Sequence, residues 1–378
     1  MTGHPLVRRV AGLLWVRLPR TVLRFSRLGG VALADGGYLR AWPPAAAGAP
    51  IAAALLGLAL GMGHPGELYS YSLVVVGALG VVAALGASLG CWSLLGFVVG
   101  DLLLSRRDEF SRLALSFSLD GLRAIAALLL SYVLLAGLLV LAPVVASVVR
   151  IVVRDWLEGR GLGVSAVGAI PVLTQMTLAF LWTQSTPFLI RPVWSYFGSS
   201  PEVPAIEPLQ QRGWIVALVV GVGVGVRLVL EARAAVHLDP FGASALAGGF
   251  PAARRWWMTV AGRTLFVTFM LSGFMSAWWV AAATAAALAG IFVLQIRVLP
   301  SASEYVRVVT GIPLIVRVAA VAVAAYGTGT FIVQRAVDEG SQSFGWLIIA
   351  TLAALTVVAF LLPEQPGVPT RPVPKDTS

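Results

Sequence analysis

Cysteine, lysine and asparagine are almost absent from this sequence. It contains one cysteine, one lysine and no asparagine. A lone thiol, Cys91, cannot form a disulfide within the chain or build a cysteine metal site, and without asparagine there is no N-glycosylation acceptor. The three histidines, His4, His64 and His237, are far apart and lie outside the long apolar runs. We therefore predict no metal site, no haem and no other bound cofactor.

Charge is scarce as well. Charged residues make up 12% of the chain and hydrophobic residues 58%, whereas an ordinary soluble domain has about 25% charged residues. So few polar groups cannot cover the surface of a water-soluble fold of this size. The apolar residues lie in long runs without the alternation that barrel strands require. We therefore predict an all-α fold, a polytopic transmembrane helical bundle.

Eight apolar runs are long enough to be candidate spans, which predicts about eight crossings. Two of them, residues 72–104 and 264–298, have about 35 residues each, which gives roughly 50 Å of helix against a hydrocarbon core of about 30 Å. A single long helix is the favoured interpretation of each, and a tight hairpin is an alternative, because both runs have tryptophan near the middle. The candidate spans are residues 45–62, 72–104, 122–149, 163–190, 213–230, 264–298, 313–333 and 345–362.

The first 44 residues form a basic segment, with seven arginines and a single acid, Asp35, up to residue 40. Arginines spaced three and four apart form one stripe on a helix, which predicts an amphipathic helix in the headgroup layer that Pro19 interrupts. The chain carries a net charge of +10, almost wholly from arginine. We interpret this charge as attraction to anionic lipids and predict no nucleic-acid partner. The residues expected to contact lipid headgroups are Arg17, Arg20, Arg24 and Arg27.

The distribution of arginine predicts a cytoplasmic N-terminus in a multi-pass protein of the cell membrane, plasma or inner. The connecting segment 231–263 weakens this orientation, because its arginines would face outward. Residues 45–362 are predicted to form one transmembrane domain. The proline-rich residues 363–378 are predicted to be a disordered tail.

Among the apolar runs, residues 163–190 contain the most polar side chains, which lie in the stretch from Pro171 to Pro187. A helix broken by prolines and lined with hydroxyl and amide groups is typical of a substrate site in transporters. Alternatively, these side chains bond to neighbouring helices or to their own backbone. Arg317 lies one turn inside the run 313–333 and is a further candidate, with an interfacial role as the alternative. The candidates for a substrate pathway are Thr174, Gln175, Thr177, Thr183, Gln184, Ser185, Thr186 and Arg317.

The remaining charges near the runs are interpreted as interfacial. Arg227 and Glu231 lie four residues apart and could pair on one helix face. Asp101 lies near Arg106 and Arg107, at a run's end, where a charge can stay hydrated. Glycines four residues apart, such as Gly57 and Gly61, predict close helix packing.

These features favour a membrane permease or translocation subunit for a small or lipophilic substrate. The sequence has no P-loop, so transport would depend on an ion gradient or on a partner, a cytoplasmic ATPase. One alternative is a non-transporting scaffold or assembly subunit that holds partner membrane subunits. A second is an intramembrane enzyme acting on lipid, which is less favoured because no acid, base or nucleophile stands out.

Overall fold

The structure of the chain is a computed structural model. It describes residues 5–23, 26–63, 72–105, 119–158, 164–196, 206–235, 256–271, 275, 277–338 and 344–362. Every regular element in these residues is a helix, and no strand occurs among them. The chain divides into two compact units: unit 1 comprises Met1–Phe117 with Ala127–Ala245, and unit 2 comprises Ser118–Ala126 with Leu246–Ser378.

Several helices are long and apolar enough to cross a membrane, so the chain is a multi-pass helical membrane protein. Five segments in the described ranges meet this criterion, or up to six if a pair bent by 90° counts as one span. The prediction of about eight spans is therefore not confirmed. The five segments are Pro43–Met62, Ala87–Leu104, Leu128–Arg150, Gly213–Ala234 and Trp278–Ser301, and the bent pair is Ser303–Gly311 with Val316–Phe331.

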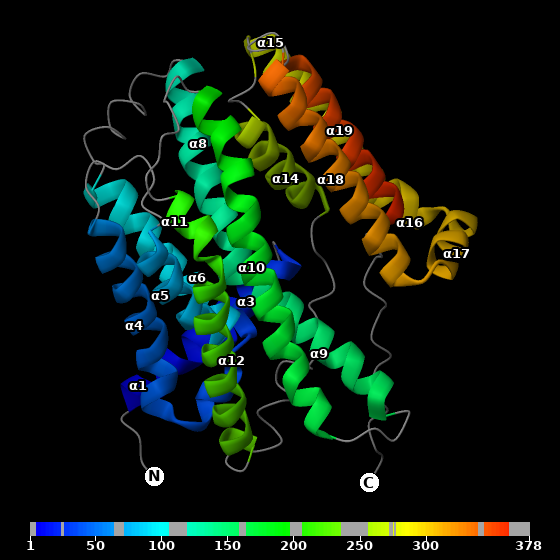
Figure 1. Cartoon of the computed structure of the whole chain (residues 1–378). Helices are drawn as coiled ribbons and strands as arrows, with labels where there is room; N and C mark the ends of the chain where they lie inside the picture. Colours follow the sequence, from blue (N-terminus) through cyan, green and yellow to red (C-terminus); the bar gives the residue numbers. More distant parts are fainter. Residues whose placement is uncertain are drawn as a thin grey trace. The chain divides into compact units, whose positions relative to one another are not determined.

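Unit 1 begins with short helices that precede the bundle (Figure 1). These are α1 (Pro5–Gly12), η1 (Leu13–Arg17), α2 (Leu18–Leu23), α3 (Arg27–Ala34) and η2 (Gly37–Ala41). The bundle comprises α4 (Pro43–Met62), α5 (Leu73–Ala84), α6 (Ala87–Val98) with η3 (Val99–Ser105), α8 (Leu119–Ala136), η4 (Gly137–Leu141), α9 (Ala142–Glu158), α10 (Val164–Tyr196), α11 (Ile206–Gln211) and α12 (Gly213–Ala235). The part of α8 up to Ala126 belongs to unit 2.

The helices α4 and α6 lie side by side and run in the same direction. A methyl group on Gly57 would lie 1.9 Å from the Ser93 carbonyl oxygen, and one on Gly61 would lie 2.4 Å from the Phe97 carbonyl oxygen. The contacts move toward the C-terminus on both helices, from Gly57 with Ser93 to Gly61 with Phe97, as in a parallel pair. Such an approach is possible only without side chains, so the predicted role of Gly57 and Gly61 in helix packing is confirmed.

The run 72–104 is two helices, and the prediction of one long helix is wrong. α5 ends at Ala84 and α6 begins at Ala87, with Leu85 and Gly86 between them. The chain folds back there, since a methyl group on Gly90 would lie 3.1 Å from the Ala83 Cβ, whereas residues seven apart on one straight helix are about 10 Å apart. Hydropathy cannot detect such a turn, because both arms are equally apolar.

The N-terminal segment packs on the bundle through Trp15. This side chain is 1% exposed, and its indole nitrogen donates to the Ala46 carbonyl oxygen of α4 at 2.7 Å. The helical run from Pro5 to Leu23 continues through Pro19, so the predicted interruption there is wrong. A π-helical turn, η1, ends at Arg17, two residues before Pro19, and such turns shift the hydrogen-bond pattern that a proline would otherwise break.

Unit 2 contains α14 (Trp256–Leu271), α15 (Trp278–Val293), η6 (Leu294–Val298), α16 (Leu299–Ser301), α17 (Ser303–Gly311), α18 (Leu314–Asp338) and α19 (Phe344–Leu361). The run 264–298 is therefore also divided, and the prediction of one long helix there is wrong. Its second helix starts at the exposed tryptophans Trp278 and Trp279, in keeping with the preference of tryptophan for a membrane interface. The core of unit 2 gathers apolar side chains of α14, α15 and α19, including Leu288, Phe292 and Ile348.

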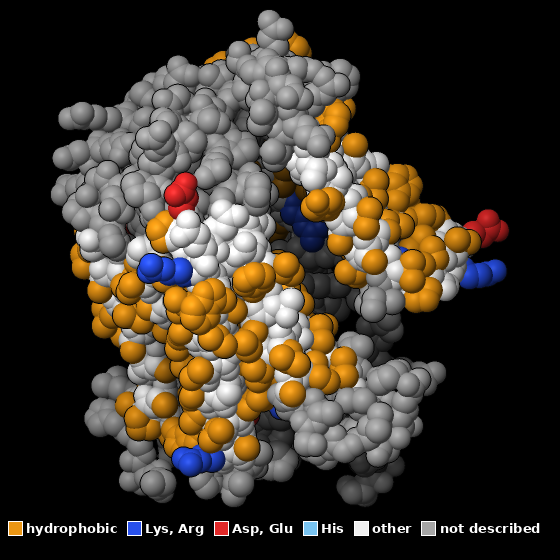
Figure 2. Space-filling model, viewed as in Figure 1, with side chains coloured by type: hydrophobic (Ala, Val, Ile, Leu, Met, Phe, Trp, Pro, Cys, Tyr) orange, Lys and Arg blue, Asp and Glu red, His pale blue; other side chains and the backbone are white. Residues whose placement is uncertain are grey.

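Apolar side chains predominate on the described surface shown in Figure 2, and charged ones are few. This is the surface expected of helices that contact lipid tails. The predicted tail 363–378 lies outside the described residues.

Candidate functional site

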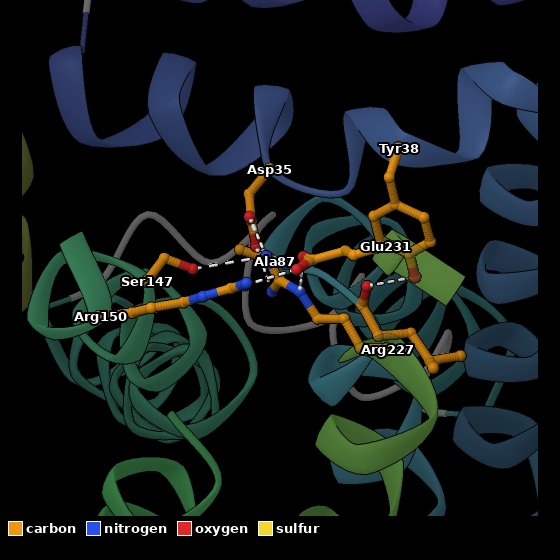
Figure 3. A network of polar contacts seen from close by, with 8 residues as sticks. Asp35, Tyr38, Ala87, Ser147, Arg150, Arg227 and Glu231 are labelled. Carbon is orange, nitrogen blue, oxygen red and sulfur yellow. Dashed lines mark hydrogen bonds and ion pairs between the residues drawn. The ribbon is translucent and has the colours of Figure 1, made fainter. Parts of the chain in front are cut away.

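Charged side chains of unit 1 gather at the end of the bundle where α6 begins and α12 ends (Figure 3). We call Asp35, Arg150, Arg227 and Glu231 the arginine network. Its members come from α12, from α9 and from the residue that follows α3. They lie up to 196 positions apart in the sequence, from Asp35 to Glu231.

Arg227 is the centre of the arginine network. Its Nη1 and Nη2 donate to Asp35 Oδ2 and Oδ1 at 3.0 and 2.7 Å, the bidentate geometry that a guanidinium forms with a carboxylate. Its Nε donates to Glu231 Oε1 at 2.7 Å. The predicted pairing of Arg227 with Glu231 is thus confirmed. The expectation that the charge of Arg227 stays hydrated is wrong, since its side chain is 11% exposed and that of Asp35 is 13% exposed.

Each acid of the arginine network has a second partner. Asp35 Oδ2 accepts the backbone N–H of Ala87, the first residue of α6, at 2.7 Å, where the positive end of the helix dipole favours an anion. Glu231 Oε2 accepts Arg150 Nη1 at 2.5 Å. Two carboxylates and two guanidiniums balance in charge, which is the condition for keeping such groups largely out of water.

Tyr38, in η2, borders the arginine network. Its hydroxyl donates to the Leu85 carbonyl oxygen at the turn between α5 and α6, at 2.8 Å. Burial raises the pKa of Tyr38 to about 12, so the phenol stays protonated at physiological pH and keeps donating. The hydrogen bonds of Asp35 and Tyr38 together hold the residues before α4 to the turn before α6.

A second polar pair joins η3, which follows α6, to α8. Tyr132 of α8 donates its hydroxyl to Asp101 Oδ2 at 2.6 Å, and the ring of Phe97 meets the Tyr132 ring edge to face at 6.3 Å between centroids. Asp101 is 3% exposed and Tyr132 is 5% exposed. The prediction that Asp101 stays hydrated at a run's end is therefore wrong. Arg106 and Arg107, named beside it, lie outside the described residues.

The polar segment of α10 belongs to an unbroken helix from Val164 to Tyr196, so the expected break at its prolines is absent. Hydroxyls of the segment bond to carbonyl oxygens of the same helix: Thr183 to Phe180, and Ser185 and Thr186 to Trp182. Gln184 reaches out of the helix, to the Gln210 carbonyl oxygen of α11 at 2.9 Å.

The structure separates the candidates on α10 by face. Gln175, Thr183 and Thr186 are buried, Thr174 and Gln184 are partly buried, and Thr177 and Ser185 are exposed. The buried face packs on α12, where a methyl group on Gly213 would lie 2.1 Å from Thr183 Oγ1. Sequence spacing alone could not assign these faces, because both are flanked by equally apolar residues.

The other predicted residues lie elsewhere. Arg317 belongs to α18 of unit 2, and its Nε is buried without a hydrogen-bond partner among the described residues. Arg17 and Arg20 are exposed on the N-terminal helices. Arg24 and the side chain of Arg27 lie outside the described residues.

Asp35 and Arg150 were not predicted as members of a site. The available signal was that Asp35 is the single acid among the arginines of the N-terminal segment. Within the described ranges, no group of three or more histidines, cysteines or acids is placed to hold a metal ion. Comparison with family models, with curated proteins and with solved structures gives no match.

Proposed function

We propose that this chain is a membrane permease or translocation subunit for a small or lipophilic substrate, multi-pass in the cell membrane and with a cytoplasmic N-terminus. The observation that carries this proposal is the buried polar face of α10, formed by Gln175, Thr183 and Thr186. Polar groups are costly inside a membrane, and those that face the interior of a transporter bundle can line a substrate or ion pathway.

In this proposal, the structure of unit 1 is a closed state of the pathway. Apolar side chains such as Leu79, Val220 and Leu139 form the core of the bundle. The arginine network lies at one end of this core, and the Asp101–Tyr132 pair joins η3, which follows α6, to α8. Ion pairs at one end of such a bundle can open and close by exchanging partners, as alternating access requires.

An ion gradient or a cytoplasmic partner ATPase would drive transport, since the sequence contains no P-loop. Arg17 and Arg20 are exposed and would contact anionic headgroups on the cytoplasmic side.

Reconstitution of the purified chain into liposomes tests the proposal. Uptake would be measured with radiolabelled tetraphenylphosphonium as a lipophilic cation, alanine as an amino acid and glucose as a neutral sugar. We expect the wild type to move at least one probe. Gln175→Leu and Gln184→Leu should reduce that uptake at least tenfold, because they remove amide groups at the buried face and beside it, while the protein stays folded.

The control is Leu173→Ala on the same helix, since Leu173 is 61% exposed. It should transport like the wild type. If none of the probes moves, and the chain co-purifies from native membranes with other subunits in fixed ratio, the scaffold alternative replaces the permease.

A further inference from the structure

Four arginines gather at one end of unit 2, where α14 begins and where η6 and α19 end. Gln295 shows that these helix ends meet. Its side chain accepts a hydrogen bond from Arg263 of α14 at 3.4 Å and donates to the carbonyl oxygen of Leu362, directly after α19, at 3.1 Å. α17 joins the same end, because the ring of Tyr305 packs on that of Phe360 in α19, with 6.2 Å between centroids. We call Arg263, Arg297, Arg307 and Arg317 the basic end of unit 2.

The charge at the basic end is strongly one-sided. Arg297 in η6 and Arg307 in α17 are exposed. Arg317 of α18 lies close enough to Tyr305 to act on its hydroxyl electrostatically. Glu304 is the one acid among the described residues of α14, η6, α16 and α17. A surface with this balance of charge attracts anions.

The basic end lies at the depth of the lipid headgroups. α15 starts at the exposed tryptophans Trp278 and Trp279, which favour one membrane interface. Arg297 follows Trp278 by 19 residues, which is about 29 Å of helix against a hydrocarbon core of about 30 Å. Arg297 therefore reaches the opposite interface. α17 meets the span Val316–Phe331 at 90°, so it runs along the plane of that interface where the span crosses the bilayer.

Arg297 is positioned for an anion by Trp256 of α14. Its Cζ lies over the Trp256 ring, 4.8 Å from the centroid, a contact that holds a guanidinium without using its N–H donors. Among the described residues, none forms a hydrogen bond or an ion pair with Arg297. A phosphate can accept two of these N–H groups at once. Trp257 and Val298, the next residues along the two helices, are 52% and 48% exposed and present apolar surface.

We propose that the basic end of unit 2 binds an anionic phospholipid, with the phosphate on Arg297 and the acyl chains against Trp257 and Val298. A lipid fits better than a soluble anion, because it presents its phosphate at this depth and brings apolar chains that cover the exposed side chains. Arg317 then has an interfacial role rather than one in a substrate pathway. The site does not depend on whether the chain transports a substrate.

Native mass spectrometry of the full chain in detergent tests the site. The probes are phosphatidylglycerol and phosphatidylcholine with the same acyl chains, which differ in the net charge of the headgroup. We expect the wild type to bind the first phosphatidylglycerol at least fivefold more tightly than phosphatidylcholine. Arg297→Gln should remove most of this preference. Trp256→Leu should reduce it as well, because the guanidinium loses the ring that holds it. Arg297→Lys should retain part of it, since an ammonium keeps the charge but not the paired donors.

The matched control is Arg233→Gln, since Arg233 is an exposed arginine at the end of a span of unit 1. It removes the same charge from the chain and should leave the preference for phosphatidylglycerol unchanged. Equal effects of Arg297→Gln and Arg233→Gln would show a general attraction between arginine and anionic lipid, and would refute the site.

Glycerol phosphate distinguishes a lipid from a soluble anion, because it has the phosphate but no acyl chains. In large excess over the lipid, it should not displace phosphatidylglycerol from the wild type. Displacement by glycerol phosphate would refute a lipid surface in favour of a site for soluble phosphate. A wild type that binds the two lipids equally would refute the proposal altogether.

Discussion

Arg227 joins parts of unit 1 that are distant in the sequence. It lies on α12, yet both of its Nη atoms bond to Asp35, 192 residues earlier. Asp35 in turn accepts the first N–H of α6. One guanidinium therefore holds the N-terminal segment and two bundle helices in register.

Replacement of Arg227 by methionine should destabilise the protein strongly. Breaking a buried ion pair by removing one partner costs roughly 3–5 kcal/mol, because the remaining charge stays buried. In Arg227→Met the uncompensated charge is that of Asp35, because Glu231 retains its ion pair with Arg150. The measurement is the thermal unfolding of the purified protein in detergent.

Arg233→Met is the control, because Arg233 is an exposed arginine on the same helix. It should change stability by less than about 0.5 kcal/mol. The double variant Asp35→Asn with Arg227→Met should recover part of the loss, as both charges are then absent. Equal stability of Arg227→Met and Arg233→Met would show that the Asp35–Arg227 pair does not hold the fold.

At the scale of elements, the contact between α4 and α6 depends on glycine. Gly57 and Gly61 of α4 face the α6 backbone, and Gly96 of α6 faces α4, where a methyl group would lie 1.9 Å from the Ala54 carbonyl oxygen. Without these glycines the two helices could not approach so closely.

Gly57→Ala should separate α4 from α6. The added methyl group would meet the backbone at Ser93, which cannot yield like a flexible side chain, and overpacking of this kind costs typically 1–3 kcal/mol. A lower unfolding midpoint in detergent is the expected result. Gly48→Ala on the same helix meets nothing within 4 Å and should leave the midpoint unchanged or slightly raised. The interpretation fails if both substitutions have the same effect.

For the whole of unit 1, the contacts give the direction of each helix. α6 runs parallel to α4, and α5 folds back on α6. α12 runs parallel to α5, as Gly80 lies against Val220 and Ala84 against Gly223. α10 runs antiparallel to α12, because Gly213 lies against Thr183 and Gly221 against Met176. The residues before α4 and the end of α12 therefore lie at the same end of unit 1.

Labelling of single cysteines in sealed vesicles should report this arrangement. In a Cys91→Ala background, Arg17→Cys and Arg233→Cys should react with a membrane-impermeant maleimide from one side. Gly63→Cys, at the end of α4, and Arg212→Cys, before α12, should react from the other. All four residues are exposed. Labelling of Arg17→Cys and Gly63→Cys from the same side would contradict the arrangement, and the side that labels Arg17→Cys identifies the orientation of the N-terminus.

The sequence by itself determined that the chain is a helical membrane protein with glycine-mediated packing, because run length, hydropathy and spacing are local properties. It also predicted the pairing of Arg227 with Glu231, since residues four apart share a helix face. Only the tertiary structure divided the long runs at Gly86 and before Trp278, because equally apolar arms give no signal for a turn. It alone brought Asp35 to Arg227 and Tyr132 to Asp101, since contacts between distant segments depend on how the helices pack and not on the composition of any one of them.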